Sequence, residues 1–514
     1  MTRPRAEVLH TALGRLHAGA FAEVIALLAP LRRANGEDVE AALLHGLACA
    51  GDGNPTEAAR VLGQVAQLRP KAPHPAVDVI ALLSKSAVPA AIDAYFNAGL
   101  ALAPQDARLL LVAGGWLQRN SRGEQARPLL ERAVALQPSL SAAQISLAAV
   151  EAESGELDEA IARLRGTLER DPGNAAALGN LGAALGVQAR FDEALGCFEQ
   201  ARRLAPRQVQ IAINHGIARL KCGQLAQGWA DLNLRLGLPG HALLPPHKLL
   251  PVLAPGVRLD GRTVLVTHDS GYGDTLQFAR YLPMLRARGA RVLLWVPQPL
   301  NRLMAETAEV FSDNRAWPLH DFHCPIIRLA EVFATTLETI PAEVPYLRVD
   351  PALMASWAQR LPEAAGKRVG LVWAGSSRES NLELLSVDRR RSIDPALLSP
   401  LLAVPGVTWV SLQLGRPHPG FEIFDPMPDV TDFADTAAII ASLDAVVSVD
   451  TSVAHLAGAL GKPVLLLDRA DHCWRWLAER TDSPWYPTLL IFRQRQWGDW
   501  STPIREIAET LSPA

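Results

Sequence analysis

The chain has 514 residues, of which 49% are hydrophobic and 20% charged, and its formal net charge is −3. A single hydrophobic core rarely extends beyond roughly 250–300 residues, so this length excludes a one-domain protein. The ordinary composition excludes a largely disordered chain, and the slightly negative charge argues against nucleic acid or an anionic membrane surface as a partner.

The first residues and the cysteines bear on the cellular compartment. Residues 1–10 lack the apolar run of a signal peptide, and no stretch approaches the roughly 18 apolar residues of a membrane span. The five cysteines are scattered and lack metal-ligand spacing. We therefore expect a cytoplasmic protein with no membrane span and no bound metal.

A 34-residue repeat fills the first half of the chain. Prolines recur at this interval, at Pro70, Pro104, Pro138, Pro172 and Pro206. Small residues keep the same register ten residues after a proline, at Gly114, Ala148, Gly182 and Gly216. Proline is excluded from helix interiors, and small residues let two helices pack closely. The pattern predicts about seven helical hairpins over residues 1–236, with shortened helices in the proline-interrupted repeat 70–103.

Stacked helical hairpins form a superhelix whose concave face commonly binds peptides. Asn180 and Asn214 occupy equivalent positions in successive repeats. Their amides could hydrogen-bond the backbone of an extended acceptor peptide. The alternative is that both are ordinary solvent-facing polar residues.

The second half of the chain has an α/β pattern. A proline-rich connector at 237–260 is followed by a strand at Thr263–Thr267, a glycine turn, a helical pattern through Arg288 and a strand at Val292–Val296. Further strands are expected at 369–373, 407–412, 445–449 and 464–467. We therefore expect two Rossmann-like lobes, 261–350 and 366–502, with a ligand cleft at the carboxyl ends of their strands. The last stretch, 503–514, is expected to form a helix that packs back across the lobes.

The glycine turn after the first of these strands is the first candidate site. Gly271 and Gly273 would let a substrate approach the backbone, and Asp274 then opens a helix. An aspartate there could take the proton of an attacking hydroxyl, as a general base. It could equally be a helix N-cap, a position that aspartate favours.

The segment 448–463 is the second candidate site. A buried strand ends at Asp450, and Thr451 and Ser452 begin a helix. Free N–H groups and the helix dipole make such a start a phosphate site, to which His455 could add a donor. Asp450 would instead face sugar or ribose hydroxyls, and the alternative for His455 is a satisfied core histidine.

A third, weaker motif combines two segments. Trp373 and Gly375 lie at the end of a predicted strand, and Arg391 ends the run Asp388–Ser392. The guanidinium of Arg391 could bind a diphosphate. The alternative is a solvated run of charges.

Together these motifs resemble bacterial tetratricopeptide-repeat (TPR) glycosyltransferases with a heptosyltransferase-like catalytic half, and more distantly O-linked N-acetylglucosamine transferases. The segments that carry the resemblance are 271–281, 324–347, 373–375, 388–392, 411–413, 432–437, 449–463 and 482–487. The resemblance implies a TPR α-solenoid followed by a two-lobed GT-B fold and a metal-independent, inverting transfer. It also implies that the C-terminal lobe binds most of a UDP-, GDP- or ADP-linked sugar.

The resemblance also implies roles for single residues. Asp274 would be the base, and Asp450, Thr451 and His455 would hold the donor. Gln413 and the loop 432–437 would lie near the nucleoside. The donor-binding set that we expect is Gly271, Gly273, Gln277, Trp373, Gly375, Arg391, Gln413, Asp450, Thr451, Ser452 and His455.

Three functions are compatible with the sequence. The first is transfer of a sugar to Ser or Thr of a protein held by the TPR groove. The second is transfer to a glycan of the lipopolysaccharide type. The third is a TPR scaffold with a degenerate transferase half, because Ser376-Ser377 and Cys473 depart from the family pattern.

Overall fold

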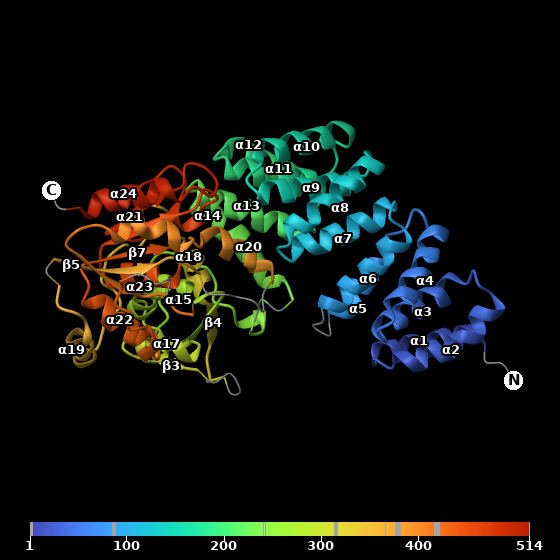
Figure 1. The fold of residues 1–514 in the computed structure, drawn as a ribbon. Helices are drawn as coiled ribbons and strands as arrows, with labels where there is room; N and C mark the ends of the chain where they lie inside the picture. Colours follow the sequence, from blue (N-terminus) through green and yellow to red (C-terminus); the bar gives the residue numbers. More distant parts are fainter. Residues whose placement is uncertain are drawn as a thin grey trace. The chain divides into compact units, whose positions relative to one another are not determined.

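A computed structural model describes residues 4–84, 89–239, 241, 243–312, 317–364, 366–375, 382–415 and 422–512 (Figure 1). The altered loop at Ser376-Ser377 lies outside these residues. The chain forms two compact units, Met1–Pro172 and Gly173–Ala514. No described helix is both long enough and apolar enough to cross a membrane.

The first unit consists of helices that pack as successive pairs. Within its described residues these are α1 (Arg5–His17), α2 (Phe21–Ala34), α3 (Val39–Gly51), α4 (Pro55–Leu68), α5 (Ala76–Leu83), α6 (Pro89–Leu102), α7 (Ala107–Arg119), α8 (Gly123–Leu136), α9 (Ser141–Glu153) and α10 (Leu157–Arg170). The 8-residue α5 is shorter than its neighbours, as its prolines predict, but α6 of the same repeat keeps 14 residues, because Pro89 stands at its first position and does not interrupt it. This arrangement confirms the helical solenoid.

The periodic residues have the structural roles that the repeat predicts. Pro70, Pro104 and Pro138 each lie two residues beyond the end of a helix, in a turn. A Cβ at Gly114 would lie 2.6 Å from Leu130 Cγ, so only glycine allows α7 and α8 to approach this closely. The repeat thus encodes both the ends of the helices and the spacing between them.

The second unit begins with the last two helical pairs. These are α11 (Ala175–Val187), α12 (Phe191–Leu204), α13 (Val209–Lys221) and α14 (Leu225–Asn233), followed by the short 3-10 turns η2 (Leu234–Gly237) and η3 (Pro246–Lys248). The connector then runs along the first sheet, where Leu250 N donates to His323 O at 2.8 Å. The compact units therefore divide within the repeats, whereas the sequence pattern changes near residue 237.

The N-terminal lobe holds a four-stranded parallel sheet in the order β3-β2-β1-β4. Its elements are β1 (Thr263–Thr267), α15 (Tyr272–Phe278), η4 (Ala279–Tyr281), α16 (Leu282–Ala287), β2 (Arg291–Trp295), α17 (Gln298–Ala305), β3 (Glu309–Phe311), β4 (Phe322–Pro325), η5 (Ile326–Arg328) and α18 (Leu329–Val332). The helix expected through Arg288 is divided into three pieces. Pro283, in the first turn of α16, has no N–H to continue the preceding helix.

The C-terminal lobe holds a five-stranded parallel sheet in the order β6-β5-β7-β8-β9. Its elements are α19 (Pro351–Arg360), β5 (Lys367–Val372), α20 (Leu382–Arg391), η6 (Pro395–Leu398), α21 (Ser399–Leu402), β6 (Val407–Ser411), η7 (Met427–Asp429), α22 (Phe433–Ala441), β7 (Ala445–Val449), α23 (Ser452–Ala459), β8 (Val464–Asp468), η8 (Trp474–Trp476), β9 (Leu489–Arg493) and α24 (Ser501–Leu511). Two parallel sheets covered by helices confirm the two-lobed α/β architecture.

The final helix differs from expectation in its packing. The main contacts of α24 are with α21, β8 and β9, so it covers its own lobe and does not cross back to the other. Ile504, Ile507 and Leu511 are buried in this contact. Their i, i+3, i+7 spacing forms one apolar stripe, which suits packing against a single sheet.

Trp229 of α14 explains why the last helical pairs belong to the α/β unit. Its ring is fully buried, with ring centroids 5.9 Å from Phe278, 5.2 Å from Trp474 and 6.3 Å from Trp485. These three aromatic residues come from both lobes. The last repeat therefore contributes to the same core as the sheets.

Replacing Trp229 with alanine is expected to destabilise the second unit by about 3–5 kcal/mol, because it removes a buried indole from a packed aromatic cluster. Urea unfolding of the full chain, followed by tryptophan fluorescence, measures this loss. Leu234→Ala is the control, since Leu234 is 45% exposed and should change stability little. Equal effects of the two substitutions would show that Trp229 is not part of the core.

Candidate active site

A cavity of about 390 Å³ lies between the two lobes. It is lined by the segments that follow β1, β5, β6 and β7, at the carboxyl ends of the strands, where an open α/β sheet binds ligands. The expected site residues that line it are Gly271, Gly273, Asp274, Arg391, Gln413, Asp450, Thr451, Ser452 and His455. The structure thus brings nine residues from four motifs to one cavity.

The lobes meet closely beside this cavity, where α15 packs on α23. A Cβ at Gly273 would lie 2.8 Å from His455 Cδ2 and 3.5 Å from Ser452 Cα. Glycine is therefore required at position 273 by the approach of the opposite lobe. At the rim, Arg302 of α17 binds Asp432 at 2.8 Å and Asp435 at 2.8 Å.

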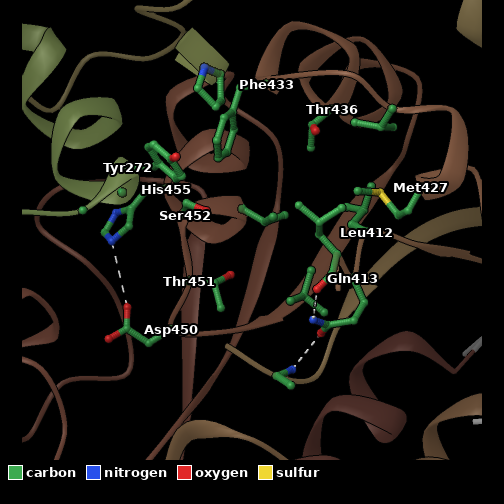
Figure 2. Close-up of a pocket in the computed structure, with 18 of the residues that line it drawn as sticks. Tyr272, Leu412, Gln413, Met427, Phe433, Thr436, Asp450, Thr451, Ser452 and His455 are labelled. Atoms are coloured by element: carbon green, nitrogen blue, oxygen red, sulfur yellow. Dashed lines mark hydrogen bonds and ion pairs between the residues drawn. The ribbon is translucent and has the colours of Figure 1, made fainter. Parts of the chain in front are cut away.

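The start of α23 forms one wall of the cavity (Figure 2). Thr451 is the N-cap residue, and within the described chain its side chain accepts no hydrogen bond from the first turn. Its hydroxyl instead lies 3.1 Å from Ser448 Oγ. The first N–H groups of α23 are thus not capped by Thr451, as an anion site at a helix start requires.

His455 is a buried side chain that also reaches the cavity. It is buried, with Nδ1 at 3.0 Å from Tyr486 Oη and its ring stacked on Trp476 at 5.2 Å, yet it also lines the cavity. Its Nε2 lies 3.9 Å from Asp450 Oδ1, the contact drawn in Figure 2. Burial, reinforced by the charge of Arg475, lowers the pKa of His455 to about 3. The imidazole is therefore neutral at physiological pH and offers a ligand a neutral hydrogen-bonding group.

Acidification is expected to destabilise the second unit through His455. Its pKa of about 3 in the folded protein is below the ordinary 6.5, so its contribution is complete above pH 6.5 and is lost as the pH falls towards 3. His455→Gln should reduce the slope of unfolding free energy against pH by up to about 1.4 kcal/mol per pH unit between pH 6 and 4. Urea unfolding at several pH values measures the slope, and identical slopes would contradict the prediction.

Asp274 is not the N-cap residue of α15, which is Gly271, but lies at the third position of the helix, so the N-cap alternative is wrong in position. Its Oδ2 accepts the N–H of Gly271 at 2.8 Å, which still satisfies a backbone donor at the start of α15. Its Oδ1 forms an ion pair with Arg475 of the C-terminal lobe. The side chain is only 12% exposed and also lines the cavity, so capping does not remove it from the site.

The guanidinium of Arg391 lies at the cavity wall, where residues of its own lobe hold it by hydrogen bonds. Its Nη1 donates to Asp450 O at 2.8 Å, and its Nη2 pairs with Asp388. Its buried Nε has no hydrogen-bond partner among the described residues. A Cβ on Gly375 would lie 2.5 Å from that Nε, so glycine at this position leaves room for the guanidinium.

Three expected donor-binding residues lie behind the cavity wall. Gln277, Trp373 and Gly375 do not belong to the described lining. Gln277 Oε1 accepts from Arg475 Nε at 2.8 Å, and Trp373 N donates to Gln413 Oε1 at 3.1 Å. Their positions suit support of the residues that line the site.

Gln413 is itself held by the backbone. Its Oε1 also accepts the N–H of Ala374 at 2.9 Å, and its Nε2 donates to Leu414 O at 3.2 Å. This amide therefore fixes the loop after β5 against the loop after β6. Figure 2 shows it beside Leu412 and Met427, on the side of the cavity opposite Asp450 and His455.

Sequence reasoning did not single out several lining residues. Tyr272 and Phe433 come from opposite lobes and meet edge to face, with ring centroids 5.2 Å apart. Met427 and Val430 add apolar surface beside Leu412. Tyr272, Leu412 and Phe433 lie within the segments 271–281, 411–413 and 432–437, but Met427 and Val430 belong to no motif that the sequence analysis found.

The two asparagines of the repeats lie outside the cavity lining. Asn180 of α11 donates to Ala176 O at 2.9 Å, and Asn214 of α13 accepts from Gln210 at 2.9 Å. Both side chains are half-buried and both belong to the second unit. Among the described residues no cluster of three or more His, Cys, Asp or Glu side chains forms a metal site.

Two family models match the chain. One, described as tetratricopeptide repeat, matches residues 117–185 and 151–220. The other, glycosyltransferase family 9 (heptosyltransferase), matches residues 428–474. This range contains many of the residues by which the C-terminal lobe lines the cavity.

Two curated proteins are similar to this chain. Protein FlbA from Caulobacter vibrioides is 27% identical over 439 residues, which cover 71% of this chain and 72% of FlbA. Cellulose synthase operon protein C from Pseudomonas fluorescens is 34% identical over 120 residues, which cover 22% of this chain and 9% of that protein.

Solved structures with a likeness to the chain include TPR proteins. YrrB, a TPR protein with an unusual peptide-binding site, is 20% identical and covers 36% of this chain and 95% of its own, with a TM-score of 0.26. A tetratricopeptide repeat protein from Parabacteroides merdae is 12% identical. The match covers 46% of this chain and 94% of that protein, with a TM-score of 0.33. The two family matches and the two-lobed α/β fold fit a TPR-fused, heptosyltransferase-like protein.

Proposed function

We propose that this chain is an inverting, metal-independent glycosyltransferase that moves a sugar from a nucleotide-sugar to a hydroxyl group. The observation that carries the proposal is one cavity with a carboxylate on one lobe and a helix start with an arginine on the other. These are the groups that a glycosyl transfer needs, namely a base for the acceptor and positive charge for the leaving group.

The donor would bind mainly to the C-terminal lobe. The N–H groups at the start of α23 and the guanidinium of Arg391 would hold the diphosphate, with His455 as a neutral neighbour. The apolar side chains of Leu412, Met427 and Val430 would enclose the nucleoside. Since backbone dipoles and a guanidinium supply the positive charge, the proposal requires no metal.

Asp274 would serve as the base. It would take the proton of the acceptor hydroxyl as that oxygen forms a bond to the anomeric carbon. The bond from that carbon to the diphosphate breaks, and the nucleoside diphosphate departs with the electron pair. Attack from the Asp274 lobe, opposite the proposed diphosphate site, would invert the configuration of the anomeric carbon.

The acceptor would be Ser or Thr of a cytoplasmic protein held by the TPR array. The array supports this proposal because such repeats are built for protein binding. Asn180 and Asn214, one repeat apart on α11 and α13, would hydrogen-bond the backbone of the bound segment.

The experiment has two stages. UDP, GDP and ADP are first compared for the rise in unfolding temperature that they cause, because a ligand of the folded state stabilises it by mass action. The sugar conjugates of the stabilising nucleotide are then supplied with peptide and glycan acceptors. Transfer to Ser or Thr supports the proposal, transfer only to glycans replaces its acceptor, and binding without any turnover would leave a scaffold.

A further inference from the structure

Arg475, from η8 of the C-terminal lobe, lies at the centre of a contact between the lobes. Its Nη2 forms an ion pair with Asp274, and its Nε donates to Gln277 Oε1 at 2.8 Å. Its Nη1 donates to Cys473 Sγ at 3.0 Å, and its guanidinium lies 4.1 Å from the ring of Trp474. Both partners on the opposite lobe belong to α15, the helix that Asp274 caps.

These contacts define the orientation of the Asp274 carboxylate. One oxygen accepts a backbone N–H from Gly271 of its own lobe, and the other accepts from Arg475 of the facing lobe. Gln277 fixes the plane of the guanidinium from behind, one helical turn from Asp274. The carboxylate can therefore keep this orientation only while the C-terminal lobe lies against α15.

The ion pair between Arg475 and Asp274 is not expected to add much to the stability of the fold. Arg475 and Asp274 are only 14% and 12% exposed, and the desolvation of two buried charges largely offsets their mutual attraction. Moreover, both side chains line the cavity, which places the pair beside the space that a ligand would occupy. A buried pair at such a place is better explained by the geometry that it imposes.

We propose that Arg475 is a positioning residue for Asp274, so that the base is aligned only when the two lobes are closed. This inference rests on the proposed function and adds a residue that the sequence motifs did not assign. A guanidinium has five N–H bonds, of which three are donated to Gln277, Cys473 and Asp274. Arg475 can thus hold the base without being released when a donor enters.

The test compares Arg475→Gln, Arg475→Lys, Arg475→Ala and Gln277→Ala in the full chain. Arg475→Gln is expected to lower kcat about 100-fold, the cost of a base misplaced by about an ångström, and to change the Kd of the nucleoside diphosphate less than about threefold. Arg475→Lys keeps the charge and should recover part of the loss. Gln277→Ala should lower kcat about tenfold, and guanidinium ion should partly rescue Arg475→Ala, which a general loss of structure would not allow.

Arg480→Gln is the matched control, because Arg480 forms an exposed ion pair with Asp482 at 2.6 Å in the same lobe and should leave kcat unchanged. An unchanged kcat in Arg475→Gln would overturn the inference. So would a Kd raised 30-fold or more with kcat intact, which would make Arg475 a donor ligand. If Arg475→Gln does not fold, Gln277→Ala and Arg475→Lys decide in the same way. Failure of the parent chain to transfer sugar would instead reject the proposed function.

Discussion

Replacing Asp274 with asparagine is expected to lower kcat by about 10²–10⁴-fold, the usual contribution of a general base. Asparagine keeps the shape of the side chain and an oxygen that can accept the N–H of Gly271, so the cap of α15 should survive. What it loses is the ability to take a proton. The measurement is the steady-state rate of sugar transfer with saturating donor and acceptor.

Two control measurements would show that the loss of activity is specific to Asp274. The Kd of the nucleoside diphosphate should stay within about threefold, because Asp274 lies on the lobe opposite the proposed diphosphate site. Asp260→Asn, which alters an exposed carboxylate at the end of the connector just before β1, should leave kcat unchanged. A fully active Asp274→Asn protein would remove Asp274 from the mechanism and leave it as a helix cap.

Replacing Arg391 with alanine is expected to raise the Kd of the nucleoside diphosphate by about 100-fold, or ~3 kcal/mol, because the guanidinium that we propose as a diphosphate donor is lost. The substitution also removes the donor to Asp450 O, which fixes the end of β7 just before α23. Isothermal titration calorimetry with the nucleoside diphosphate measures the change.

The neighbouring Arg389 provides the control, since it is exposed and does not line the cavity. Arg389→Ala should leave the Kd within about twofold. Arg391→Lys should show an intermediate loss, because an ammonium keeps the charge but lacks the planar fork of donors. Equal affinities for Arg391→Ala and the parent chain would place the diphosphate away from Arg391.

Local patterns allowed much of the fold to be predicted. The strands at 263–267 and 445–449 have the bounds that their apolar runs indicate, and the helix at 452 begins where the Thr-Ser pair predicts. Short strands were harder to predict from the sequence. The strands β3 and β4 have only three and four residues, which are too few to show a periodic pattern. The packing of α24 was also not predictable, because an amphipathic stripe does not specify which sheet it covers.

The candidate site was predictable where a motif joins a strand to a turn. Asp450 directly follows β7, and Asp274 and His455 lie near the starts of the helices that come after β1 and β7, at the carboxyl ends of parallel strands. Gln277 lies in the same motif as Asp274, and Trp373 in the same motif as Arg391, but both lie behind the cavity wall. Sequence position alone does not say which of two neighbouring side chains faces the cavity, since that depends on the path of the turn.

The sequence by itself determined the 34-residue helical array, the two α/β lobes and the strand-to-helix turns, because each of these follows from interactions between residues close in the chain. Only the tertiary structure decided that Arg475 meets Asp274 across 201 residues, and that Trp229 of the last repeat is buried against both lobes. Such contacts depend on how separate segments pack, and a pair of distant side chains has no periodicity in the sequence that would reveal it.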